Sequence, residues 1–126
     1  MKLDMVGLIV ENMKESISFY QLLGFQLLEG DETASYVELN NEGVRISLNK
    51  IEMITEVLGF KPEITGDKIE LAFLCESKKE VNELVEKIRQ NQFEIIQESF
   101  LAPWKQYYAL VRDADRNIIS LFVNEN

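Results

Sequence analysis

One order of structural elements occurs twice along the chain, and this repeat limits the possible folds more than any other feature. Each copy reads as a buried strand, a capped helix and further strands in the order βαβββ. The tripeptide Ile-Ser-Leu closes both copies, at residues 46–48 and at residues 119–121. Such a tripeptide is common by itself, but here it follows the same elements in the same order. The sequence therefore predicts a duplicated α+β fold.

The first copy begins with an apolar strand expected over residues 3–10. Asn12 with Glu15 three positions later is typical of a helix start. Gly24 is typical of the residue that follows a helix, so we expect a helix over residues 13–23. The strands expected to follow span residues 25–29, 34–39 and 44–48.

A short helix, expected over residues 51–58, and a segment rich in turn residues join the two copies. In the second copy, Ser77 and Glu80 repeat the capping pattern and start a helix that is expected to run to about residue 90. Asn91 stands where the first copy has its glycine, and Asn tolerates the left-handed conformation. The strands expected here span residues 69–75, 93–97, 107–111 and 118–123, with a loop over residues 98–105.

These boundaries divide the chain into a first module at residues 1–50, a linker with a short helix at 51–67, and a second module at 68–126. We expect the two modules to share one structural domain, because 126 residues is an ordinary size for a single domain.

Composition excludes several classes of function. A net charge of −9 argues against a nucleic-acid partner, which is usually bound by Lys and Arg side chains. The apolar runs are too short to cross a membrane, and the first residues lead directly into a strand, so we expect no membrane partner and a cytoplasmic location. The chain contains no histidine, and its single cysteine, Cys75, lies in an apolar run, which favours a buried inert thiol over a nucleophile.

Several short motifs resemble those of one superfamily. The first copy contains Val-Gly-Leu-Ile-Val at 6–10, Ser-Phe-Tyr at 18–20 and Leu-Gly-Phe at 23–25. The second contains Trp104, Tyr-Ala-Leu-Val at 108–111 and the turn Asp-Ala-Asp-Arg-Asn at 113–117. In these motifs the chain resembles the glyoxalase, bleomycin-resistance and extradiol-dioxygenase superfamily, also called vicinal oxygen chelate proteins. The turn is similar to the family's Asp-Pro-Asp-Gly-Asn, from which Ala114 and Arg116 depart.

The resemblance implies an eight-stranded cup made of two tandem βαβββ modules, with the helices outside. Enzymes of the superfamily hold a divalent metal inside it, through the first and last strand of each module. Alignment of the two copies matches those positions with Met5, Ser47, Glu70 and Ser120, where the metal enzymes carry His, Glu or Gln. One carboxylate, one thioether and two hydroxyls make a poor ligand set, so we predict no metal, no cofactor and no catalytic residues.

The cup can still bind a ligand. The alternation of side chains along the strands directs one set inward, and the aromatic residues of the last hairpin suit stacking on a planar molecule. One of Tyr107 and Tyr108 is expected to face the cavity, and the pattern leaves open which one. The candidate ligand-binding residues are Met5, Tyr36, Arg45, Ser47, Asn49, Glu70, Trp104, Tyr107, Tyr108, Ser120 and Phe122.

Structural roles compete with these assignments. The aromatic cluster could fill the core, and Glu70 could form an ion pair with Arg45 or Lys68 rather than face a ligand. A metal site built differently, from Glu38, Glu70 and Glu98, also stays open.

Three functions follow. The first is a metal-independent protein, as in the bleomycin-resistance branch, that sequesters an antibiotic or a planar metabolite. The second is a metal-dependent lyase, isomerase or dioxygenase of the same superfamily, and the third is a structural or regulatory module whose cup is filled by its own side chains. The residues favour the first and leave the ligand's identity open. The resemblance also implies a homodimer.

Overall fold

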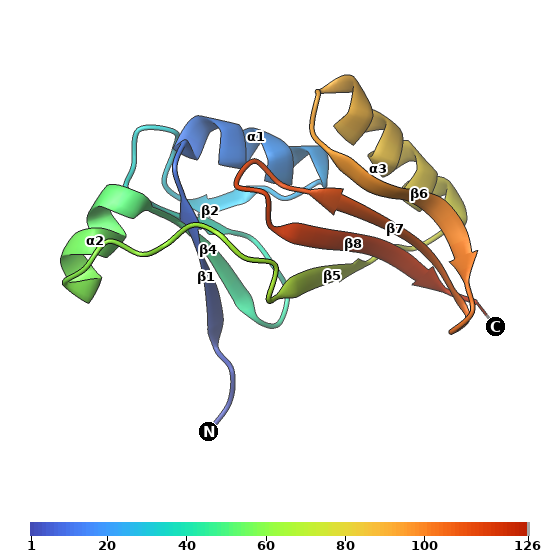
Figure 1. Ribbon diagram of the computed structural model, residues 1–126, viewed down its shortest axis with the longest axis horizontal. Helices are drawn as coiled ribbons and strands as arrows, with labels where there is room; N and C mark the ends of the chain where they lie inside the picture. Colours follow the sequence, from blue (N-terminus) through green and yellow to red (C-terminus); the bar gives the residue numbers. More distant parts are fainter. Residues whose placement is uncertain (126) are drawn as a thin grey trace. The chain divides into compact units, whose positions relative to one another are not determined.

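The computed structural model describes residues 1–125 and forms two compact units, Met1–Thr65 and Gly66–Asn126. The described residues form eight strands in two four-stranded mixed sheets, with three helices (Figure 1). This confirms the α+β fold with two βαβββ modules that the vicinal oxygen chelate resemblance implies. The longest of these helices has 13 residues, and none has the length and apolar character needed to span a bilayer.

In the first unit, the first strand pairs in parallel with the last, and the strand order is β1-β4-β3-β2. Helix α1 packs against β4 and buries an apolar face that includes Phe19 and Tyr20. The Asn12 side chain accepts a hydrogen bond from the Glu15 backbone amide at 3.0 Å, which confirms the expected helix start. The elements are β1 (Met5–Val10), α1 (Met13–Leu22), β2 (Leu27–Glu29), β3 (Tyr36–Leu39), β4 (Arg45–Lys50) and α2 (Ile51–Leu58).

The second unit repeats this topology, with the strand order β5-β8-β7-β6 and a parallel pair of first and last strands. Helix α3 covers one face of the sheet, where it buries Val81, Val85 and Ile88. Ser77 Oγ accepts from the Glu80 amide at 3.0 Å. The elements are β5 (Glu70–Leu74), α3 (Lys78–Gln90), β6 (Ile95–Ala102), β7 (Gln106–Arg112) and β8 (Ile118–Asn124).

The register shows which residues of the two units correspond. Ser47 pairs with Gly7 in the first unit, as Ser120 pairs with Ala72 in the second. Two residues before Gly7 and Ala72 lie Met5 and Glu70, so the strand pairing supports the alignment of the copies made from the sequence. The third strand of each unit adds a further match. Tyr36 pairs with Asn49, and Tyr108 pairs with Phe122, the residues two positions after the two serines.

Strand β6 corrects one expectation. Residues 98–102 belong to this strand and not to a loop, because Phe100 and Ala102 pair with Tyr108 and Gln106 of β7. The register of β6 shifts between Ile95 and Gln97 and again before Phe100. Such irregularities interrupt the alternation of apolar and polar residues by which a strand is recognised in a sequence.

The end of α3 corrects a second expectation. The left-handed residue is Gln92, with a φ of 67°, whereas Asn91 has a φ of −95°. Gln92 therefore corresponds to Gly24, whose φ is 100°. The hydrogen bonds agree, because the amides of Phe25 and Phe93 donate to the carbonyls five residues earlier in both units. Asn91 instead donates its side-chain amide to the Lys87 carbonyl at 2.8 Å.

We expect Gln92→Gly to raise the free energy of unfolding by about 0.5 kcal/mol, because glycine removes the left-handed strain at a modest entropic cost. Urea titration followed by circular dichroism measures the change. Asn91→Gly is the matched control and should destabilise the protein, since its φ is negative and its side chain caps the helix. Stabilisation by the Asn91 change but not by the Gln92 change would contradict this account of the helix end.

Candidate functional site

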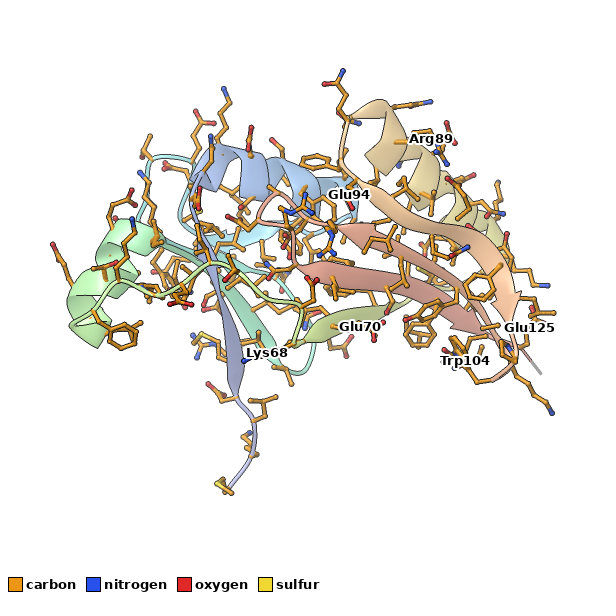
Figure 2. The ribbon with its side chains drawn as sticks, viewed as in Figure 1. Lys68, Glu70, Arg89, Glu94, Trp104 and Glu125 are labelled. Carbon is orange, nitrogen blue, oxygen red and sulfur yellow. The ribbon has the colours of Figure 1, made fainter. Side chains whose placement is uncertain are left out.

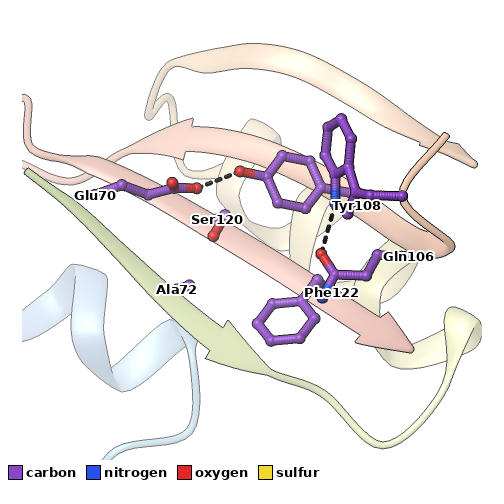
Figure 3. A pocket seen from close by; sticks show the side chains of 7 residues that line it. Glu70, Ala72, Gln106, Tyr108, Ser120 and Phe122 are labelled. Atoms are coloured by element: carbon purple, nitrogen blue, oxygen red, sulfur yellow. Dashed lines mark hydrogen bonds between the residues drawn. The ribbon is translucent and has the colours of Figure 1, made fainter. Parts of the chain in front are cut away.

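A pocket of about 340 Å³ lies on one face of the second unit's sheet. Its lining follows strand alternation, because residues two apart on β5, β7 and β8 point into it. The intervening residues Ile119 and Leu121 are buried instead on the other face. Figure 2 shows Glu70 on β5, Trp104 in the turn between β6 and β7, and Arg89 on α3. The lining residues are Glu70, Ala72, Trp104, Gln106, Tyr108, Ser120 and Phe122 (Figure 3).

A carboxylate and a phenol meet at one end of the pocket. The Tyr108 hydroxyl donates a hydrogen bond to the Glu70 carboxylate. Burial raises the pKa of Tyr108 above its usual value, and the bond to Glu70 raises this pKa further. Tyr108 is therefore a protonated donor at neutral pH, and it orients Glu70. Ser120 Oγ is buried beside this pair and makes no hydrogen bond of ordinary geometry. Its proximity favours the ionised form of Tyr108 and so opposes part of the rise in the pKa of Tyr108.

Aromatic rings form a wall of the pocket. Trp104 is 55% exposed, and its indole Nε1 donates to Gln106 Oε1 at 2.7 Å. Gln106 Nε2 in turn donates to Asn124 Oδ1 at 3.0 Å, so the indole is held from behind by a chain of hydrogen bonds. The Trp104 and Tyr108 ring centres lie 5.3 Å apart at an angle of 83°. This exposure and these contacts fit a binding wall better than core filling.

The structure places Tyr108 in the pocket and Tyr107 on the face covered by the helix. The Tyr107 hydroxyl donates to Asn82 Oδ1 of α3 at 2.8 Å. The Lys78 amino group lies 5.5 Å from the centre of the Tyr107 ring. Tyr107 therefore joins the helix to the sheet.

The first unit's candidate residues lie together on one face of their own sheet. Ser47 Oγ donates to the Met5 sulfur at 3.2 Å and accepts from Asn49 Nδ2 at 2.9 Å. The Tyr36 hydroxyl lies 3.9 Å from the same sulfur, as the Tyr108 hydroxyl meets Glu70 in the second unit. The two units thus share one arrangement, in which a tyrosine of the third strand reaches the matching position on the first strand.

Arg45 has a different partner from the one considered in the sequence. Its guanidinium donates to both oxygens of Glu38, at 2.7 and 3.1 Å, and to Asp4 at 3.1 Å. Tyr36 donates to Glu38 as well, at 3.0 Å. The hydrogen bonds from Arg45 lower the pKa of Glu38, although desolvation opposes them. Arg45 therefore has acidic partners within its own unit. Among residues 66–125 no cationic side chain lies within ion-pair distance of Glu70, so the structure contains no Lys68–Glu70 pair.

The residues present do not fit a divalent metal. Met5 and Ser47 use their polar atoms on each other, and in the second unit the oxygens are a single carboxylate and the hydroxyls of Ser120 and Tyr108. Within residues 1–125, no group of three or more His, Cys, Asp or Glu side chains could hold a metal ion. Of the alternative acidic set, Glu38 pairs with Arg45, and Glu98 pairs with Arg89 of α3 at 2.5 Å.

One polar lining residue, Gln106, was missed from the sequence. Gln106 lies two residues before Tyr108 on β7, so the alternation that places Tyr108 in the pocket also indicates Gln106. Cys75 contributes no nucleophile, because burial raises the pKa of its thiol to about 12.

Comparison with known proteins identifies relatives across nearly the whole chain. Residues 2–121 match the family model described as "Glyoxalase/Bleomycin resistance protein/Dioxygenase superfamily". No curated protein sequence matches the chain significantly. The match to the family model covers both units.

Solved structures share the fold at low sequence identity. A glyoxalase/bleomycin resistance protein/dioxygenase family enzyme from Burkholderia phytofirmans PsJN is 23% identical, with a TM-score of 0.87 over 98% of this chain and 99% of that chain. A glyoxalase-related enzyme from Fulvimarina pelagi is 16% identical, with a TM-score of 0.87 over 98% and 88%. A lactoylglutathione lyase from Agrobacterium tumefaciens is 13% identical, with a TM-score of 0.72 over 97% and 92%.

Glu38 predicts a dependence of stability on pH. Its pKa in the folded protein lies below the usual 4.5, so its stabilising contribution is complete above about pH 4.5 and is lost as the pH falls through the folded value. We expect Glu38→Gln to lose less stability than the parent protein between about pH 5 and about pH 3. Urea midpoints across this range measure the difference.

Glu98→Gln is the control, because Glu98 is also paired with an arginine but is 61% exposed. Its effect on the pH dependence should be smaller, since water and salt screen an exposed pair. Equal effects of the two variants would contradict a special role for the buried Glu38.

Proposed function

The chain belongs to the glyoxalase/bleomycin resistance protein/dioxygenase superfamily, and we propose that within it this protein binds and sequesters a small planar molecule without a metal ion. The ligand would be an antibiotic or a planar metabolite. The observation that carries the proposal is the pocket of the second unit, where an aromatic wall stands beside the Glu70–Tyr108 pair. Aromatic side chains beside a few oriented polar groups are typical of small-molecule sites.

The pocket's preorganisation supports binding. Trp104 is held by Gln106, and Glu70 is held by Tyr108, so both side chains are already ordered before a ligand arrives. Ordering such groups costs free energy when it happens on binding. A pocket whose walls are fixed in advance therefore binds a rigid flat molecule more tightly than a pocket with mobile walls would.

Trp104→Ala tests the wall. We expect ligand affinity to fall about tenfold or more, whereas the free energy of unfolding should fall by about 1 kcal/mol or less, because the side chain is half exposed. Planar compounds found by a thermal-shift screen supply the ligands, and calorimetry gives the affinities. Phe60→Ala is the matched control, since Phe60 is an apolar side chain of similar exposure in the first unit. Strong destabilisation with unchanged binding would make Trp104 a core residue.

The alternative is a metal-dependent lyase, isomerase or dioxygenase. It draws on the Glu70 carboxylate at one of the superfamily's metal positions and on a structural neighbour named as a lactoylglutathione lyase. Donor chemistry favours the metal-free proposal, because Met5 and Ser47 supply neither a charge nor an imidazole.

Elemental analysis separates the two functions. We expect dialysed protein to carry far less than one divalent ion per chain, and its melting temperature to be unchanged by a chelator or by added Zn²⁺, Mn²⁺ or Ni²⁺. Stoichiometric metal that survives dialysis would overturn the metal-free proposal. The homodimer and the cytoplasmic location stay predictions from the sequence, and light scattering checks the first.

A further inference from the structure

We infer that the pocket of the second unit selects ligands with a planar, positively charged head group, an amidinium or a guanidinium, and that Glu70 accepts its N–H groups. This inference rests on the proposed function, because it names the ligand class for the same pocket. It names the kind of ligand that the pocket prefers, whereas the proposed function states only that the pocket binds a small planar molecule.

The charge of the lining is the first observation. Glu70 is the single ionisable carboxylate among the seven lining residues, and none of them is cationic. Two acidic residues on or next to the strands are instead neutralised by arginines, Glu38 by Arg45 and Glu94 by Arg112 and Arg116. Glu70 has a phenol as its partner instead, so its negative charge remains available to a ligand.

The geometry of Glu70 is the second observation. A carboxylate has about four acceptor positions, and Tyr108 uses one of them. The hydrogen bond from Tyr108 fixes the carboxylate while leaving positions for two N–H groups in one plane. Amidinium and guanidinium groups present such a pair, which is why they bind carboxylates in a bidentate manner.

The remaining walls suit the same head group. Trp104, Tyr108 and Phe122 line the pocket with aromatic rings, and a cation over such a ring is attracted by its electron-rich face. Ser120 Oγ is buried in the lining without a hydrogen-bond partner of ordinary geometry. A further N–H group of the ligand would satisfy it. Anionic ligands would meet the repulsion of Glu70 in a chain with a net charge of −9.

Three probes of nearly the same shape test the inference: benzamidinium, benzamide and benzoate, which differ chiefly in charge. Trp104 is the chain's single tryptophan, so its one indole N–H signal in a two-dimensional ¹H–¹⁵N spectrum reports binding at the pocket. We expect benzamidinium to bind about tenfold more tightly than benzamide, and benzoate to bind most weakly. The factor is modest because Glu70 is exposed to solvent. Salt at about 1 M should weaken the binding of benzamidinium more than the binding of benzamide.

Glu70→Gln keeps the side chain's shape and its acceptor for Tyr108 but removes the charge. We expect this variant to bind benzamidinium and benzamide equally, whereas Glu83→Gln, on the exposed surface of α3, should keep the parent's preference. Equal binding of the charged and neutral probes to the parent protein would overturn the cation selection and leave the binding proposal standing. If neither these probes nor the larger planar compounds shift the Trp104 signal, the proposed function itself fails.

Discussion

The parallel pairing of the first strand with the last strand in each unit is the constraint on which the site depends. It sets Glu70 beside β8 and Met5 beside β4, although both residues lie on the edge strand of their sheet. Because side chains alternate along a strand, this single pairing decides which residues share the face away from the helix. The pocket is the result in the second unit, and the polar cluster around Ser47 is the result in the first.

The two units show how one backbone plan carries different chemistry. Equivalent tyrosines, Tyr36 and Tyr108, reach a thioether in one unit and a carboxylate in the other. In the first unit Arg45 neutralises the buried acid, so the polar groups there satisfy one another. In the second unit Glu70 has no cationic neighbour among residues 66–125, and its charge faces the pocket. Duplication thus supplied two similar surfaces, and a few side chains decide which of them is available to a ligand.

Features that repeat along the chain could be predicted from the sequence, whereas contacts between different strands could not. The duplicated order, the helix starts at Asn12 and Ser77 and the pocket face of β8 all follow from local patterns. The pairing of Arg45 with Glu38 requires knowing which strands are neighbours, and several acids were equally plausible partners. The irregular register of β6 and the left-handed Gln92 were missed because neither leaves its usual mark in the sequence.

The matched tyrosines also limit how this scaffold could be redesigned. Introducing histidines at Met5 and Ser47 would not by itself create a metal site. The Tyr36 hydroxyl lies 3.9 Å from the Met5 sulfur, which one of the imidazoles would replace. The same obstacle stands beside Glu70, where Tyr108 occupies one lone-pair direction of the carboxylate. Introducing a metal ion in either unit would therefore require removing that unit's tyrosine as well as adding ligands, and the removal would free the neighbour that the tyrosine now contacts.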